Sequence, residues 1–133
     1  MAKFQLILTA FALLSIGSLS SCRNNDDPTI GEITVYNNLG EVVPGARVRL
    51  YCTEQDCIVE DAKVSNGLGI TRHEFFQPMV LAIEAIKLDT TVTDTGVPPN
   101  VGFIIKIDSA YGESFITIEK NKTISAPVLI LPQ

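Results

Sequence analysis

The chain has 133 residues and a formal net charge of −5 at neutral pH, from 10 Lys and Arg against 15 Asp and Glu. This length is close to the commonest size of a single domain and leaves little room for a second hydrophobic core. The acidic balance argues against nucleic acid as a partner and against a polybasic contact with a membrane.

The first residues have the pattern of a secretory signal peptide. Lys3 is the only charged residue before Cys22, and an apolar run over residues 4–16 follows it. A run of about 13 residues is too short to span the hydrocarbon core of a bilayer, but it has the length of the apolar region of a signal peptide. We therefore expect residues 1–21 to be removed.

The expected cleavage site carries a second signal. Leu19-Ser20-Ser21-Cys22 resembles the lipobox of bacterial lipoproteins, in which a leucine and two small residues precede a cysteine. The resemblance implies that the sulfur of Cys22 receives a diacylglycerol, which would hold the mature protein on its membrane. The alternative is an ordinary secretory signal with an incidental cysteine.

Residues 22–29 are expected to form the lipidated cysteine and a flexible tether, because they are polar and lack apolar periodicity. Asp26 and Asp27 resemble the export signal of Bacteroidota-type lipoproteins. That resemblance implies an outer-membrane lipoprotein of the cell envelope that faces the cell surface. A solvated linker that happens to contain two aspartates is the alternative.

From residue 30 onward the pattern is typical of β-structure. Runs rich in Val, Ile, Thr and aromatic residues recur about every ten residues, separated by Gly, Asn and Pro. We expect a single all-β domain over residues 30–133, a small Greek-key-type β-sandwich of about seven strands. The expected strands cover residues 30–36, 46–53, 58–64, 70–76, 79–86, a hairpin at 103–119 that turns at 109–112, and 128–131. Residues 87–100 are expected to form the longest loop, and a helical turn at 79–86 stays open.

The second expected strand has a cationic and aromatic outer face. Its alternation directs Val48, Leu50 and Cys52 to one side and Arg47, Arg49 and Tyr51 to the other. Because Arg and Tyr are enriched at interface hot spots, the second set is a candidate partner contact. An ordinary solvated sheet face is the alternative.

Several segments resemble the carboxypeptidase regulatory-like, or prealbumin-like, β-sandwich family. They are Gly31-Glu32-Ile33-Thr34-Val35, the turn ending at Gly40, and Val43-Pro44-Gly45-Ala46-Arg47-Val48-Arg49-Leu50. Pro44 fixes φ and Gly45 admits a positive φ, so the chain can reverse sharply into the second strand. The chain departs from the family at Met79 and Val80, where a glycine and a tyrosine usually follow the proline.

The resemblance implies a binding or assembly module anchored in the envelope by lipid, without catalytic activity, whose partner is an envelope protein or a glycan. A purely structural envelope lipoprotein is one alternative, and a transthyretin-like hydrolase is another. The hydrolase branch of the family depends on several histidines and a C-terminal Tyr-Arg-Gly-Ser segment. This chain has only His73 and ends in Leu-Pro-Gln, so we expect no catalytic residues.

No metal or cofactor site is expected either. A zinc site needs three or four ligands, and His73 has no partners at metal-ligand spacing. The acidic residues lack the alternating spacing of a calcium loop; they are Glu54, Asp56, Glu60 and Asp61. Asp89-Thr90-Thr91 and Asp108-Ser109-Ala110 resemble the three-residue O-glycosylation sequence of Bacteroidota-type exported proteins.

Cys52 and Cys57 are expected to form a disulfide. If Cys22 carries the lipid, they are the only remaining thiols, and the compartment beyond the inner membrane is oxidising. A tight polar reversal between them would bring their Cα atoms to about 4.4–6.8 Å. The alternative is two free thiols, with Cys52 packed in the core.

Overall fold

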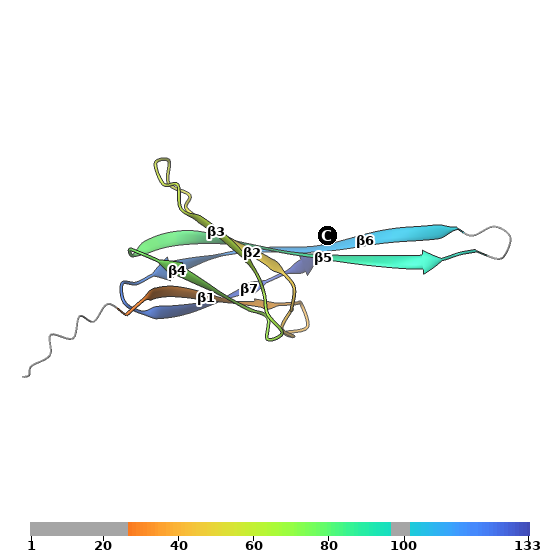
Figure 1. Cartoon of the computed structure of the whole chain (residues 1–133), viewed down its shortest axis with the longest axis horizontal. Helices are drawn as coiled ribbons and strands as arrows, with labels where there is room; N and C mark the ends of the chain where they lie inside the picture. Colours follow the sequence, from red (N-terminus) through yellow and green to blue (C-terminus); the bar gives the residue numbers. More distant parts are fainter. Residues whose placement is uncertain (1–26, 97–101) are drawn as a thin grey trace, which may run out of the picture.

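The computed structural model describes residues 27–96 and 102–133. Every regular element in these ranges is a β-strand, and eight strands, β1 to β8, form two sheets (Figure 1). The expected all-β sandwich is therefore confirmed. The expectations for the signal peptide, for lipidation of Cys22 and for most of the tether lie outside the described residues.

The smaller sheet has three strands in the order β4-β1-β7. They are β1 (Thr29–Tyr36), β4 (Ile70–Phe75) and β7 (Thr123–Leu129). β1 is antiparallel to β4 and parallel to β7. Ile33 and Val35 of β1 alternate into the core, so the pairing register is set by the buried face.

The larger sheet has five strands in the order β3-β2-β5-β6-β8, each antiparallel to its neighbours. They are β2 (Arg47–Tyr51), β3 (Glu60–Val64), β5 (Met79–Asp94), β6 (Phe103–Ile118) and β8 (Leu131–Pro132). The chain passes from one sheet to the other after β1, β3, β4, β6 and β7. These crossings give the connectivity its Greek-key character.

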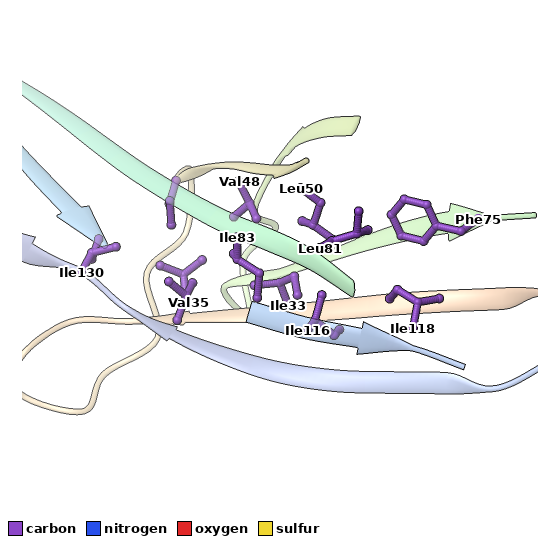
Figure 2. Close-up of a cluster of buried hydrophobic side chains, with 13 residues drawn as sticks. Ile33, Val35, Val48, Leu50, Phe75, Leu81, Ile83, Ile116, Ile118 and Ile130 are labelled. Carbon is purple, nitrogen blue, oxygen red and sulfur yellow. The ribbon is translucent and has the colours of Figure 1, made fainter. Parts of the chain in front are cut away.

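The core lies between the two sheets and consists of aliphatic side chains with one phenylalanine (Figure 2). The larger sheet contributes Val48 and Leu50 from β2 and Leu81 and Ile83 from β5, all fully buried. Ile33 from β1 meets them from the smaller sheet. Each such side chain contributes about 1.5–3 kcal/mol on burial, so this layer is the main source of stability.

The turn into β2 is built as the Pro44-Gly45 step predicts. Gly45 has φ of 71°, in the left-handed region that glycine adopts without strain. The hydroxyl of the buried Ser65 donates to the carbonyl of Val43 at 2.7 Å and accepts from the backbone N–H of Ala46 at 2.9 Å. These bonds join the start of β2 to the end of β3.

The region after residue 86 differs most from expectation. Residues 87–94 belong to β5 rather than to a loop, and β6 runs without interruption through the turn expected at 109–112. The β5–β6 ladder continues from Met79↔Ile118 to Asp94↔Phe103. Gly112 does not mark a turn; it is the point where the backbone of Leu129 passes too close to leave space for a side chain.

Other strand limits differ by smaller amounts. β2 ends at Tyr51 and β3 begins at Glu60, because the disulfide-closed reversal occupies the residues between them. The last expected strand, at 128–131, is wrong in extent. β7 begins at Thr123, and β8 is a separate pairing of Leu131 and Pro132 with β6.

The extra length of β5 and β6 projects from the sandwich as a two-stranded ribbon (Figure 1). We call residues 88–94 of β5 and 103–109 of β6 the arm. Their strands pair with each other, and their side chains are exposed or partly buried.

Candidate partner-binding surface

The three predicted contact residues lie on the outer face of the larger sheet, but two of them are engaged by neighbours. Arg49 Nε is 3.0 Å from a carboxylate oxygen of Glu60, and its Nη1 is 3.6 Å from one of Glu84. The Arg49 guanidinium also lies 4.4 Å from the centre of the Tyr51 ring. Within the described part of the chain, Arg47 has no ion-pair partner, so it is the cation that this face offers to another molecule.

The outer face continues sideways across the sheet. Cross-strand partners in an antiparallel pair project from the same side, and Arg47 is paired with Ile86, which is paired with Tyr111. The Tyr111 hydroxyl donates a hydrogen bond to Glu113, and this bond raises the pKa of Tyr111 to about 12. Leu131 of β8 extends the same row.

The row of Arg47 and Ile86 leads directly onto one side of the arm. Five large apolar side chains project there, each between 58 % and 65 % exposed. We call this set the apolar arm face; it consists of Leu88, Val92, Phe103, Ile105 and Ile107. Thr90, Ser109 and, at the outer end, Asp94 complete the same side.

The opposite side of the arm is polar, with Ile104 as its large apolar residue. It carries Lys106, whose Nζ is 2.9 Å from a carboxylate oxygen of Asp108, and it also carries Asp89. Within the sandwich the apolar side of β5 is the inner one, as at Leu81 and Ile83. Beyond Ile86 the apolar side is the outer one, so the arm does not prolong the core but presents a second apolar surface.

Sequence reasoning found Arg47, Arg49 and Tyr51 but missed the larger part of this surface. The alternation of Phe103, Ile105 and Ile107 was visible, yet periodicity alone does not tell which side of a strand meets the core. The matching alternation at Leu88, Thr90 and Val92 was the available signal that the expected loop is a strand.

The expected disulfide between Cys52 and Cys57 is present, so the alternative of two free thiols is wrong. The two Cα atoms are 5.7 Å apart. The Cys57 N–H donates to the carbonyl of Glu54 at 3.2 Å, which tightens the reversal. A surface hollow of about 610 Å³ lies between this loop and the β4–β5 turn, and it is lined in part by Gln77 and Met79.

His73 is fully buried and links the two sheets. Its Nδ1 is 2.8 Å from a carboxylate oxygen of Asp61 on β3, and its Nε2 is 2.9 Å from the hydroxyl of Thr71 on β4. Burial lowers the pKa of His73, and the hydrogen bond and charge of Asp61 only partly offset this effect.

The sequence of hydroxyl, imidazole and carboxylate at these three residues is that of a nucleophilic triad. Thr71 and His73 are buried, however. A nucleophile needs an open side from which the reacting carbon can approach. The geometry therefore describes a link between β3 and β4 and gives Thr71 no route to a substrate.

In residues 27–96 and 102–133, no three His, Cys, Asp or Glu side chains are grouped so that they could hold a metal ion. The same ranges contain no helix of the length and apolarity needed to cross a bilayer.

Comparison with known proteins gives no family assignment. No protein-family model matches the sequence, and no curated protein matches it significantly. The features of this surface that suggest a function are the apolar arm face and Arg47 at its base.

Proposed function

We propose that this chain is a non-catalytic binding or assembly module of the bacterial cell envelope, anchored at the outer membrane by lipid on Cys22. In this proposal it is a Bacteroidota-type lipoprotein whose mature domain is of the carboxypeptidase regulatory-like kind. The lipobox-like Leu19-Ser20-Ser21-Cys22 supports the anchor. The strand order β4-β1-β7 and β3-β2-β5-β6 is compatible with the domain.

The apolar arm face is the observation that carries the binding role. Soluble monomers rarely expose large contiguous apolar patches, and such patches mark contacts with other molecules. Its members, such as Ile105 and Ile107, lie side by side along the arm and are more than half exposed. Covering them would remove apolar area from water at about 25 cal/mol per Å².

The two alternative functions have less support. A purely structural envelope protein does not need a projecting ribbon whose apolar side faces away from its own core. A hydrolase needs an accessible nucleophile or base, whereas Thr71 and His73 are buried between the sheets. Neither alternative explains the exposed apolar arm face, whereas a binding partner would cover it.

Site-specific photo-crosslinking of the full chain tests the proposal in a lipoprotein-competent bacterial host. A photoreactive residue in place of Ile105, on the arm, should give a discrete covalent adduct in intact envelopes. The matched control is Ser125, which is exposed on β7 of the other sheet and should give none. Equal labelling from both positions, or no adduct from Ile105, would contradict a partner at the arm.

A further inference from the structure

We propose that the partner of the apolar arm face is the same face of a second copy of this chain, packed antiparallel about a two-fold axis. This inference rests on the proposed function, since it names the partner of the surface described there. Its basis is the placement of charge on that surface.

Two charged residues bound the apolar arm face, one at each end. Arg47 lies at the base, in the row of Ile86, and Asp94 lies at the outer end, opposite Phe103. Asp94 accepts a hydrogen bond from the backbone N–H of Gly96 at 2.8 Å. Neither side chain has an ion-pair partner among residues 27–96 and 102–133.

The rows between these two charges are uncharged on this side. They are the pairs Leu88↔Ser109, Thr90↔Ile107 and Val92↔Ile105. The middle row, Thr90↔Ile107, is four residues from Ile86 and four from Asp94 along β5. At about 3.3 Å per residue, the two ends lie about 13 Å on either side of it. The pattern is therefore positive, apolar, negative, with the apolar part centred.

A closed two-fold interface requires a surface that is complementary to itself. The antiparallel form has its two-fold axis in the plane of the interface, perpendicular to the strands and passing through the middle row. Each strand then lies over the same strand of the other copy, and the two run in opposite directions. Asp94 then lies over Ile86 of the other copy, offset sideways from Arg47 by about one strand spacing of 4.8 Å, with about 10 Å between the two facing ribbons. An extended Arg47 side chain can reach the Asp94 carboxylate across this gap. Because the interface is symmetric, the same contact between Asp94 and Arg47 forms at both of its ends.

The apolar residues match under the same operation. Phe103 lies over Tyr111, where two aromatic rings can stack. Val92 lies over Leu88, and Ile107 lies over its own copy at the axis. The other face-to-face arrangement, with the axis along the strands, would bring both Asp94 side chains to one end of the interface and both Arg47 side chains to the other end. No Arg47 would then lie near an Asp94, so the charges favour the antiparallel form.

The size of the surface sets the expected strength. A strip about 26 Å long and two strands wide buries less than the about 800 Å² per partner of a standard interface. We therefore expect a dimer that dissociates in the micromolar range in detergent solution. Confinement of both copies to one membrane by lipid would raise their effective concentration.

Cysteine crosslinking of the full chain in envelopes tests the geometry. Ile107→Cys places a thiol at the axis, and a short bifunctional thiol reagent should then give a covalent homodimer of twice the chain mass. Ile104→Cys is the matched control, because it makes the same substitution on the same strand, with similar exposure, on the opposite side of the arm. It should stay monomeric.

A charge exchange tests the ends of the interface. Arg47→Glu alone and Asp94→Arg alone should each weaken the dimer of purified lipidated chain about tenfold, because two symmetric attractions become repulsions. The double variant should return to within about threefold of the original dissociation constant. Failure of the double variant to recover would overturn the antiparallel register.

The outcomes separate this inference from the proposed function. If Ile107→Cys gives an adduct with a different protein, or if Ile104→Cys dimerises equally well, the face-to-face homodimer is overturned while a binding role stands. If Ile107→Cys gives no adduct and the photoreactive residue at position 105 gives none either, both are overturned. A homodimer specific to Ile107→Cys supports both.

Discussion

His73 shows how one buried residue can join two sheets. An ionised carboxylate only accepts hydrogen bonds, so Asp61 requires the proton on Nδ1 of His73. Nε2 is then an acceptor, and it takes the hydroxyl proton of Thr71. The neutral ring therefore has a hydrogen-bond partner for both of its nitrogen atoms in the interior.

The first prediction is a loss of stability in mild acid that depends on His73. Its pKa is lowered in the folded state by burial from the ordinary value of 6.5, although Asp61 raises it and Lys63 lowers it further. Below pH 6.5 the unfolded chain therefore binds the proton that the folded chain resists, and the free energy of unfolding falls as pH drops. Above pH 6.5 the contribution of His73 to the free energy of unfolding does not change with pH.

Urea denaturation of the wild type and of His73→Gln between pH 8 and pH 5 measures this effect. The glutamine variant should start less stable and have a shallower dependence on pH. An unchanged pH slope in the variant would show that other groups are responsible.

The second prediction concerns Gly112, where two backbone segments meet. An added Cβ would overlap the carbonyl of Leu129, and that segment is fixed because the Ile130 N–H donates to Tyr36 O at 2.9 Å. Gly112→Ala should therefore cost about 1–3 kcal/mol of unfolding free energy. Gly67→Ala is the control, since nothing lies within 4 Å of its added Cβ. Equal stability of the two variants would contradict the close approach.

At the scale of single elements, the reversal between β2 and β3 depends on its crosslink. The Cys52–Cys57 bond closes a short loop, for which chain entropy gives about 2 kcal/mol. The third prediction is a loss of about this size when the bond is reduced, measured as a lower urea midpoint. Intact mass after alkylation without reductant should show neither cysteine modified in protein from the envelope; uptake of two labels would refute the bond in vivo.

Elements with a buried face were predictable from sequence, and the exposed ribbon was not. The limits of β1 and the alternation of Val48 and Leu50 follow from period two with one side in the core. The strand from Lys87 to Asp94 has no buried side, and its threonines and aspartates are also typical of loops. Its conformation comes from pairing with β6, which is a long-range contact.

At the scale of the molecule, the candidate surface was predicted only at its base. Arg47, Arg49 and Tyr51 were placed correctly on one outer side, because alternation within a single strand determines that. The apolar arm face depends on which residues of β5 lie opposite Phe103, Ile105 and Ile107. Such cross-strand neighbours cannot be read from one strand alone.

The fourth prediction is that the whole protein partitions with membranes through Cys22. Cys22→Ala should move it from the membrane fraction to the soluble fraction, because the domain then lacks its acyl chains. Labelling with a fatty-acid analogue checks the chemistry directly. Wild-type chain that stays unlabelled in a lipoprotein-competent host would refute the anchor.

The position of β1 has a mechanical consequence. β1 is the middle strand of its sheet, hydrogen-bonded to β4 on one side and to β7 on the other. The start of β1 and the arm lie toward opposite ends of the molecule (Figure 1). A pull between those ends runs along the strands, so it loads both ladders of β1 in shear, all bonds at once, instead of peeling them in turn. A domain tethered at one end and gripped at the other would carry that tension with its strands intact.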